Sequence, residues 1–231
     1  MGRNIAIIPA RGGSKRIPRK NIRSFLGKPI LSYSIETAIK SGLFDEIMVS
    51  TDDNEIVSIA EKFGASVPFL RKEETSNDFA PLVDVLLEVL DEYNKRGESF
   101  DNVCCILPTA PLITVDNIVK AYNIISTSDF DSVCPVVSFS YPILRSLCID
   151  DSGKLKMNWP EYRYSRSQDL PLSYHDTGTF YWIKSKVLME DKKIFAENGT
   201  AIVLDELQVQ DIDTETDWAL AEMKYRLMHK L

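Results

Sequence analysis

The chain has 231 residues, of which 44% are hydrophobic and 26% are charged, a globular composition with length for one principal domain and a small appendage. Its 34 acidic and 27 basic side chains give a formal charge of −7, which argues against nucleic acid as a partner. The apolar run at residues 5–10 is too short for a signal peptide or a membrane span, so we expect a cytoplasmic protein with no membrane partner.

Short apolar runs alternate with amphipathic segments through the first half of the chain, which is typical of a mostly parallel sheet with helices on both faces. We expect strands at residues 5–9, 47–50, 67–70, 103–107 and 132–137, and regular segments again at 179–183 and 201–204. Apolar side chains at helical spacing predict helices after residue 53, around 83–90, around 118–125 and from about residue 214. The fold class is therefore α/β.

The pattern changes between about residues 138 and 175. Prolines and a turn at 150–153 interrupt short β-type runs that are rich in aromatic side chains. Regular structure returns on the far side, so we interpret residues 138–175 as a β-rich arm inserted into a single domain that spans residues 1–231.

The most informative segment is residues 8–21, Ile-Pro-Ala-Arg-Gly-Gly-Ser-Lys-Arg-Ile-Pro-Arg-Lys-Asn, which follows the first strand. Loops at this end of a parallel strand line the ligand crevice of α/β sheets. Glycine amides can approach phosphate oxygens closely, and the basic side chains can stabilise their charge. The spacing matches neither a Walker A loop nor a dinucleotide fingerprint. A solvated basic turn is the alternative, but the glycine pair and the position after the strand favour a polyphosphate site.

Taken with later blocks, this loop resembles the amino-terminal signature of the acylneuraminate cytidylyltransferases, which activate nonulosonic acids as CMP-sugars. The other matching blocks are Gly-Lys-Pro-Ile at 27–30, Ser-Thr-Asp-Asp at 50–53, Phe-Leu-Arg at 69–71, Pro-Thr-Ala-Pro at 108–111 and Asp-Ile-Asp-Thr at 211–214. The resemblance implies a Rossmann-like nucleotidyltransferase fold, CTP as substrate, Mg²⁺ as cofactor, and a homodimer formed through the arm.

Residue by residue, the resemblance implies specific roles. Nucleotide contacts fall on Ala10, Arg11, Gly12, Gly13, Ser14, Lys15, Asn21 and Arg71. The resemblance implies that Lys15 and Arg11 are the catalytic cations and that Asp211 and Asp213 are the ligands of Mg²⁺. The chemistry of the two carboxylates agrees, because residues two apart in an extended segment point to the same side and can share a hard cation. The alternative is that Asp213 or Thr214 only caps the last helix.

The choice of sugar depends on departures from the sialic acid enzymes, which usually carry a glutamine in the block at 107–109 and an asparagine before Gly178. A Ser-Ser pair after the third strand is also absent, and residues 78–82 read Asp-Phe-Ala-Pro-Leu instead. The runs Arg-Ser-Gln-Asp-Leu at 166–170 and Tyr-His-Asp-Thr-Gly at 174–178 resemble the branch that activates pseudaminic acid. Candidate sugar contacts are Thr109, Arg166, Gln168 and Asp176.

These features predict transfer of CMP from CTP to a nine-carbon acidic sugar, with release of pyrophosphate. Pseudaminic acid is the expected acceptor, and legionaminic or N-acetylneuraminic acid are alternatives. A nucleotide sensor without catalytic activity is the alternative from another class.

Overall fold

The computed structural model describes residues 2–231 and has a seven-stranded sheet at its centre. The strand order is β11-β6-β10-β5-β1-β4, and β9 pairs with the last residues of β6. The strands are β1 (Asn4–Pro9), β4 (Glu46–Ser50), β5 (Asn102–Ile106), β6 (Ser132–Ser138), β9 (Tyr174–Asp176), β10 (Phe180–Lys184) and β11 (Gly199–Val203). β1 is parallel to β4 and β5, and β11 is parallel to β6, whereas β10 is antiparallel to both of its neighbours.

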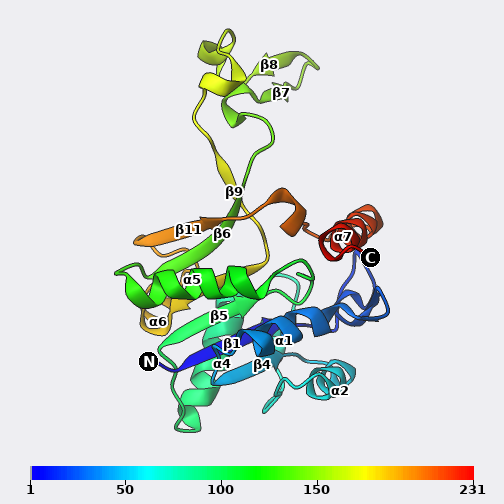
Figure 1. The fold of residues 1–231 in the computed structure, drawn as a ribbon, viewed down its shortest axis with the longest axis vertical. Coiled ribbons are helices and arrows are strands. Elements are labelled where there is room, and N and C mark those ends of the chain that lie inside the picture. Colours follow the sequence, from blue (N-terminus) through cyan, green and yellow to red (C-terminus); the bar gives the residue numbers. More distant parts are fainter. Residues whose placement is uncertain (1) are drawn as a thin grey trace.

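Helices cover both faces of this sheet (Figure 1). Side chains alternate along β1, so that Ala6 and Ile8 enter one core cluster and Ile5 and Ile7 enter the other. The first cluster packs against α1 (Ile30–Ser41), α2 (Asn54–Lys62) and α5 (Val115–Thr127), and the second against α4 (Leu82–Lys95) and α6 (Ser185–Asp191). The predicted α/β class, with helices on both faces of a mostly parallel sheet, is confirmed. No helix within residues 2–231 is long and apolar enough to cross a membrane.

A third apolar cluster joins the two ends of the chain. It lies between the last helix, α7 (Glu215–His229), and the hairpin of β2 (Ser24–Phe25) and β3 (Lys28–Pro29). Its buried members are Ile17, Phe25, Ile30, Tyr33, Ile212, Trp218 and Ala221. Because Ile17 and Ile212 both belong to it, this cluster holds the segment before α7 beside the loop that follows β1.

A reciprocal capping box begins α7. The hydroxyl of Thr214 accepts from the Asp217 N–H at 3.2 Å, and the Asp217 carboxylate accepts from the Thr214 N–H at 2.8 Å. Of the two residues considered as caps of the last helix, Thr214 is the cap, and capping does not use the carboxylate of Asp213.

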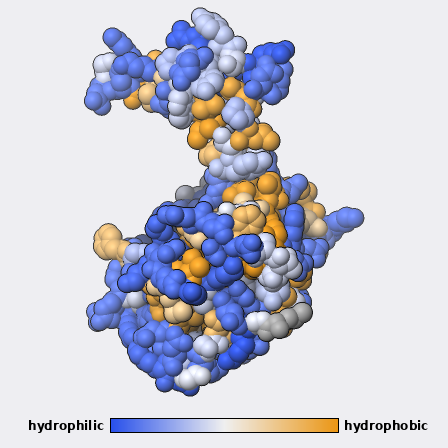
Figure 2. Space-filling model, turned by 90° about the vertical axis from the view of Figure 1, so that its left-hand side faces the viewer, coloured by the Kyte–Doolittle hydropathy of each residue, from blue (hydrophilic) through white to orange (hydrophobic). Residues whose placement is uncertain are grey.

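The segment that we interpreted as an arm, about residues 138–175, leaves the body between β6 and β9 (Figure 1). β7 (Leu147–Ile149) and β8 (Leu155–Met157) form a separate antiparallel pair at its far end. Leu147, Ile149 and Leu155 expose more than half of their surface. Figure 2 shows further apolar surface where the arm joins the body.

The strand predicted at residues 67–70 is wrong. Only an isolated bridge between Met48 and Ser66 forms there, and Pro68 cannot donate a hydrogen bond to a neighbouring strand. Phe69 packs against Tyr93 instead. The segment leads to a short helix, α3 (Glu73–Ser76), before α4 begins.

Candidate active site

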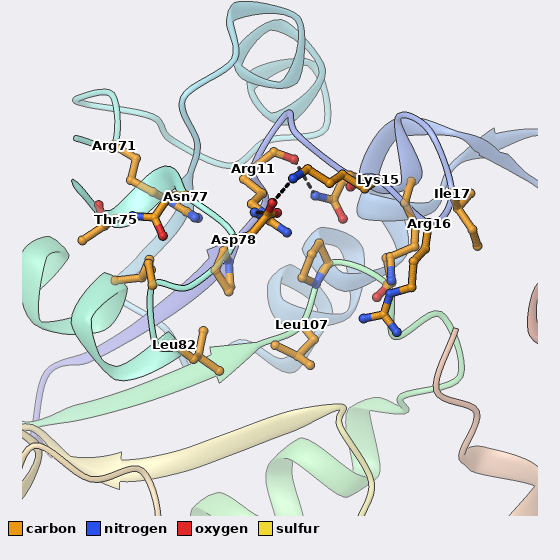
Figure 3. A pocket seen from close by; sticks show the side chains of 18 residues that line it. Arg11, Lys15, Arg16, Ile17, Arg71, Thr75, Asn77, Asp78, Leu82 and Leu107 are labelled. Carbon is orange, nitrogen blue, oxygen red and sulfur yellow. Dashed lines mark hydrogen bonds and ion pairs between the residues drawn. The ribbon is translucent and has the colours of Figure 1, made fainter. Parts of the chain in front are cut away.

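A cleft of about 290 Å³ lies at the carboxyl ends of β1 and β5 (Figure 3). Three segments form it: the loop after β1, the segment from Arg71 through α3 to the first turn of α4, and the residues after β5. The lining residues are Pro9, Arg11, Ser14, Lys15, Arg16, Ile17, Lys20, Asn21, Arg71, Thr75, Asn77, Asp78, Ala80, Leu82, Val85, Leu107, Pro108 and Thr109. The basic loop singled out in the sequence therefore lines the edge of the sheet at which α/β folds bind ligands.

The loop after β1 is held by hydrogen bonds that its backbone groups make with side chains. The Gly12 N–H donates to Asp52 Oδ1 at 2.9 Å, and the side-chain amide of Asn21 donates to the Arg11 carbonyl at 2.9 Å. A Cβ on Gly12 would lie 2.6 Å from a carboxylate oxygen of Asp53. Glycine at this position is therefore required by the close approach of the loop that follows β4.

Two cations of the cleft converge on one carboxylate. Arg11 Nη1 lies 2.5 Å from Asp78 Oδ1, and Lys15 Nζ pairs with Asp78 Oδ2. In Figure 3 the three side chains point toward one another, whereas Arg16 lies at the other end of the cleft. Hydrogen bonds from Lys15 and Arg11 hold the pKa of Asp78 below its usual value. Arg11 and Lys15 thus form a point at which an anion is bound.

Arg71 differs from these cations because it is buried, with 8% of its surface exposed. Its Nε donates to the Ser50 hydroxyl at 2.9 Å, and its Nη2 donates to the Ser50 carbonyl at 2.5 Å. Burial lowers the pKa of Arg71 to about 10, which still leaves the guanidinium charged at neutral pH. Arg71 is therefore a fixed positive charge in the wall of the cleft.

Asp213 contacts the same loop from the opposite end of the chain. Arg16 Nη1 lies 2.5 Å from Asp213 Oδ2, and Lys20 Nζ lies 3.6 Å from Asp213 Oδ1. Lys20 also donates to the Ile212 carbonyl at 2.6 Å. The segment before α7 and the basic loop are thus directly joined, as the metal hypothesis requires.

A second cleft, of about 310 Å³, contains Asp211. Phe139 and His175, from the base of the arm, line it together with Glu206 and Lys224. The rings of Phe139 and His175 lie 4.9 Å apart. This cleft combines the apolar ring of Phe139 and the imidazole of His175 with charged groups of both signs, a composition suited to a polar ligand with a ring framework.

The donor set at Asp211 and Asp213 fits a hard divalent cation. Ile212 between them is buried, so the two flanking carboxylates lie away from the core. Desolvation, followed by the negative charge of Asp213, raises the pKa of Asp211, and a cation would relieve that repulsion. Within residues 2–231 no group of three or more His, Cys, Asp and Glu side chains gathers at a metal-binding distance. A pair of carboxylates still suits Mg²⁺, which takes most of its ligands from water and phosphate.

The remaining candidates are distributed unevenly. Thr109 lines the first cleft with Arg11, Ser14, Lys15, Asn21 and Arg71. Ala10 is buried in the core, and only its backbone faces the loop, where its N–H donates to the Ser50 carbonyl at 2.9 Å. Ala10, Gly12 and Gly13 are not among the residues that line the first cleft. The assignment of Thr109 to the sugar and of the other residues to the nucleotide stays a prediction.

The three candidate sugar contacts nearer the arm lie outside the first cleft. Asp176 accepts from the Tyr181 hydroxyl at 2.6 Å and from the Gly178 N–H at 3.0 Å. Arg166 pairs with Asp169 at 2.8 Å on the arm, and Gln168 lines a small depression formed by arm residues. Within residues 2–231, no side-chain hydrogen bond or ion pair joins Arg166 or Gln168 to the body.

Sequence reasoning missed the part played by Asp78. Its signal was the block at residues 78–82, which we had noted only for the serine pair that it lacks. Asp52 and Asp53 belong to a matching block, but spacing alone does not indicate that Asp52 accepts from Gly12 or that Asp53 pairs with Arg19 at 2.6 Å. The sequence shows Lys20 as one of the basic residues of the loop, but it does not indicate the contacts of Lys20 with Ile212 and Asp213.

Comparisons with known proteins identify the family. Residues 5–217 match the family model described as cytidylyltransferase. The chain is 41% identical to a pseudaminic acid cytidylyltransferase of Campylobacter jejuni, over 99% of this chain and 98% of that one. It is 34% identical to a CMP-N,N'-diacetyllegionaminic acid synthase of Legionella pneumophila, over 95% of each.

Among solved structures, the fold resembles that of a CMP:2-keto-3-deoxy-manno-octonic acid synthetase complexed with CTP. The TM-score is 0.69 at 17% identity, covering 99% of this chain and all of the other. At that identity the likeness establishes the fold only. The family model and the two relatives cover nearly the whole sequence and confirm the resemblance read from its motifs, and the chain therefore belongs to the cytidylyltransferase family.

Proposed function

We propose that this protein transfers CMP from CTP to pseudaminic acid and releases pyrophosphate. The observation that carries the proposal is the joining of the basic loop to the segment before α7 through Arg16, Lys20 and Asp213. This contact joins the loop that carries Arg11 and Lys15 to the segment that carries the carboxylates expected to bind the metal. The acceptor is taken from the similarity to the Campylobacter relative, whose name specifies pseudaminic acid.

The nucleotide is proposed to occupy the first cleft. Arg11 and Lys15 bind the phosphates, with charge-assisted hydrogen bonds that strengthen as negative charge moves to the leaving pyrophosphate. Arg71 is fixed in the cleft wall and is assigned to the cytosine. Ser14 and Asn21, which also line the cleft, contribute hydrogen bonds to the nucleotide.

The chemical step is a direct displacement. The anomeric hydroxyl of the sugar acid attacks the α-phosphorus of CTP, and the bond from that phosphorus to the bridging oxygen of the β-phosphate breaks. Pyrophosphate leaves, the hydroxyl proton passes to solvent, and no covalent enzyme intermediate is formed. Positioning and charge stabilisation by Arg11 and Lys15 are therefore the main contributions of the protein.

Asp211 and Asp213 are proposed to hold Mg²⁺. Bound there, the ion would supply positive charge to the phosphate oxygens and orient them. Arg16 and Lys20 hold Asp213 at the edge of the first cleft, so the carboxylate is positioned by the same loop that binds the phosphates.

The acceptor is proposed to occupy the second cleft, which shares Asp211 with the metal pair. Asp176 is fixed by Tyr181 close to His175, which lines this cleft. Arg166 and Gln168 lie on the arm, and we propose that they serve the acceptor within a homodimer formed through the exposed Leu147 and Ile149 of the arm. Arg166 would then grip the sugar carboxylate of a neighbouring subunit.

Pyrophosphate release by the purified protein tests the proposal. The protein is incubated with Mg²⁺, each of the four common ribonucleoside triphosphates, and pseudaminic, N,N'-diacetyllegionaminic or N-acetylneuraminic acid. We expect release with CTP and pseudaminic acid at a kcat/KM well above every other pair. A preference for diacetyllegionaminic acid would overturn the choice of acceptor, and binding of CTP without release for any acid would favour the nucleotide sensor.

A further inference from the structure

Asp78 makes both of its short ionic contacts inside the nucleotide cleft. One carboxylate oxygen lies 2.5 Å from Arg11 Nη1, and the other pairs with Lys15 Nζ. These are the two cations that the proposed function assigns to the triphosphate. A carboxylate bound to both of them stands where phosphate oxygens would bind.

The other basic groups of this cleft have different partners. Arg71 donates to Ser50 in the cleft wall, and Arg16 pairs with Asp213 at the far end. Lys20 donates to a backbone carbonyl before α7. Of the cleft-lining cations within residues 2–231, only Arg11 and Lys15 are neutralised by a carboxylate from the segment around α3.

We propose that Asp78 is a resident anion that competes with the polyphosphate for Arg11 and Lys15, and that it thereby weakens the binding of CTP and hastens the release of pyrophosphate. This inference rests on the proposed function, because it takes the cleft as a polyphosphate site. The competition acts equally on any ligand that must displace Asp78. CTP and pyrophosphate should therefore lose affinity by the same factor.

The position of Asp78 suits such an exchange. It lies in the loop between α3 and α4, where the neighbouring Phe79 exposes 92% of its surface. The Phe79 N–H donates to Asn77 Oδ1 at 2.8 Å, which is a local bond within the loop. Few buried contacts would be lost if the loop moved, so Asp78 can leave the cations without disturbing the core.

The charge of Asp78 is preserved at working pH. Its two cationic partners hold its pKa below the usual value for an aspartate, so it is an anion throughout the neutral range. The exchange therefore replaces one anion by another, and Arg11 and Lys15 are kept in the cleft and partly neutralised between turnovers.

The test compares the wild-type protein with Asp78→Asn, which keeps the shape and removes the charge. Calorimetry measures the affinities for inorganic pyrophosphate, CTP and cytidine, with Mg²⁺ at constant concentration. Exposed ion pairs of this kind are each modest, so we expect Asp78→Asn to bind pyrophosphate about 2- to 30-fold more tightly. CTP should gain by the same factor and cytidine should be unchanged. Inhibition of turnover by pyrophosphate should strengthen in parallel.

Glu73→Gln is the matched control, because it removes one negative charge from the same exposed segment. Asp78→Ala, compared with the wild type by its unfolding temperature, separates loss of competition from misfolding. Weaker or unchanged binding of pyrophosphate to a folded Asp78→Asn protein overturns the inference, and so does an equal gain in Glu73→Gln. Tighter pyrophosphate binding without CMP transfer to any sugar acid would support it while removing the proposed function.

Discussion

Replacing Trp218 by alanine removes the largest side chain of the cluster that joins the two ends of the chain. Trp218 exposes only 4% of its surface, its ring lies 5.7 Å from the ring of Phe25, and the guanidinium of Arg23 lies 4.5 Å above it. Truncation of a buried tryptophan costs about 3–5 kcal/mol of unfolding free energy. For a chain of this length each kcal/mol shifts the unfolding temperature by about 2–4 °C, so we expect a fall of roughly 6–20 °C.

The same substitution should weaken metal binding. Ile212 lies in the cluster with Trp218, and it is flanked by the two aspartates proposed to bind Mg²⁺. Loosening the cluster separates them from the basic loop, so the Mg²⁺ concentration that gives half-maximal activity should rise while the affinity for cytidine changes little.

Far-UV circular dichroism measures the unfolding of this variant without relying on tryptophan fluorescence. The control is Met223→Ala, because Met223 lies on the same helix and exposes 60% of its surface. This substitution should change the free energy of unfolding by less than about 0.5 kcal/mol. A loss below about 1 kcal/mol in Trp218→Ala, or an unchanged requirement for Mg²⁺, would refute the argument that this cluster positions the metal ligands.

Three other predictions follow from single contacts. Lys15→Ala should lower kcat about 100- to 1000-fold without changing the unfolding temperature, because the side chain is 80% exposed; activity close to wild type would remove its catalytic role. Gly12→Ala places a Cβ 2.6 Å from a carboxylate oxygen of Asp53, so it should lower the free energy of unfolding by about 1–3 kcal/mol and raise the KM for CTP. A Cβ on Gly13 meets no atom within 4 Å, so Gly13→Ala should keep the same unfolding temperature. The lysine and turn amides that Asp150 binds lower its pKa to about 2. Its stabilisation of the arm hairpin is therefore full above the unfolded value of about 4 and is lost as the pH falls toward 2. Hydrogen exchange of the hairpin amides, corrected for intrinsic rates, should accelerate over that range, and pH-independent protection would contradict this prediction.

The regular part of the fold was predictable because its sequence signals are local. The alternation of apolar runs and helical stripes identified β1, β4, β5 and β6 and the helices α2, α4 and α5, since buried strands and one-faced helices leave periodic patterns. No strand forms at 67–70, because an apolar run alone does not distinguish a strand from a loop that packs on a core, and Pro68 lacks the N–H that a paired strand would donate.

The site was predictable only where a sequence motif indicated it. The glycine and lysine loop directed attention to Arg11 and Lys15, and these side chains do line one cleft. The block at residues 78–82 departs from the family pattern, but nothing in it indicates the partners of Asp78, because its contact with Arg11 joins residues 67 positions apart in the chain. The place of Arg166 and Gln168 could not be foreseen either, since no periodicity indicates how far an inserted segment extends from the body.

The arm also has a consequence for how the protein behaves on dilution. An isolated pair of short strands is barely stable in water, and β7 and β8 pair only with each other while exposing Ile149 at 72% and Leu155 at 64%. If a second subunit covers these side chains, then the order of the arm is linked to protein concentration by mass action. Specific activity would fall at concentrations below the dissociation constant of the dimer, even though the body and its nucleotide cleft stay folded.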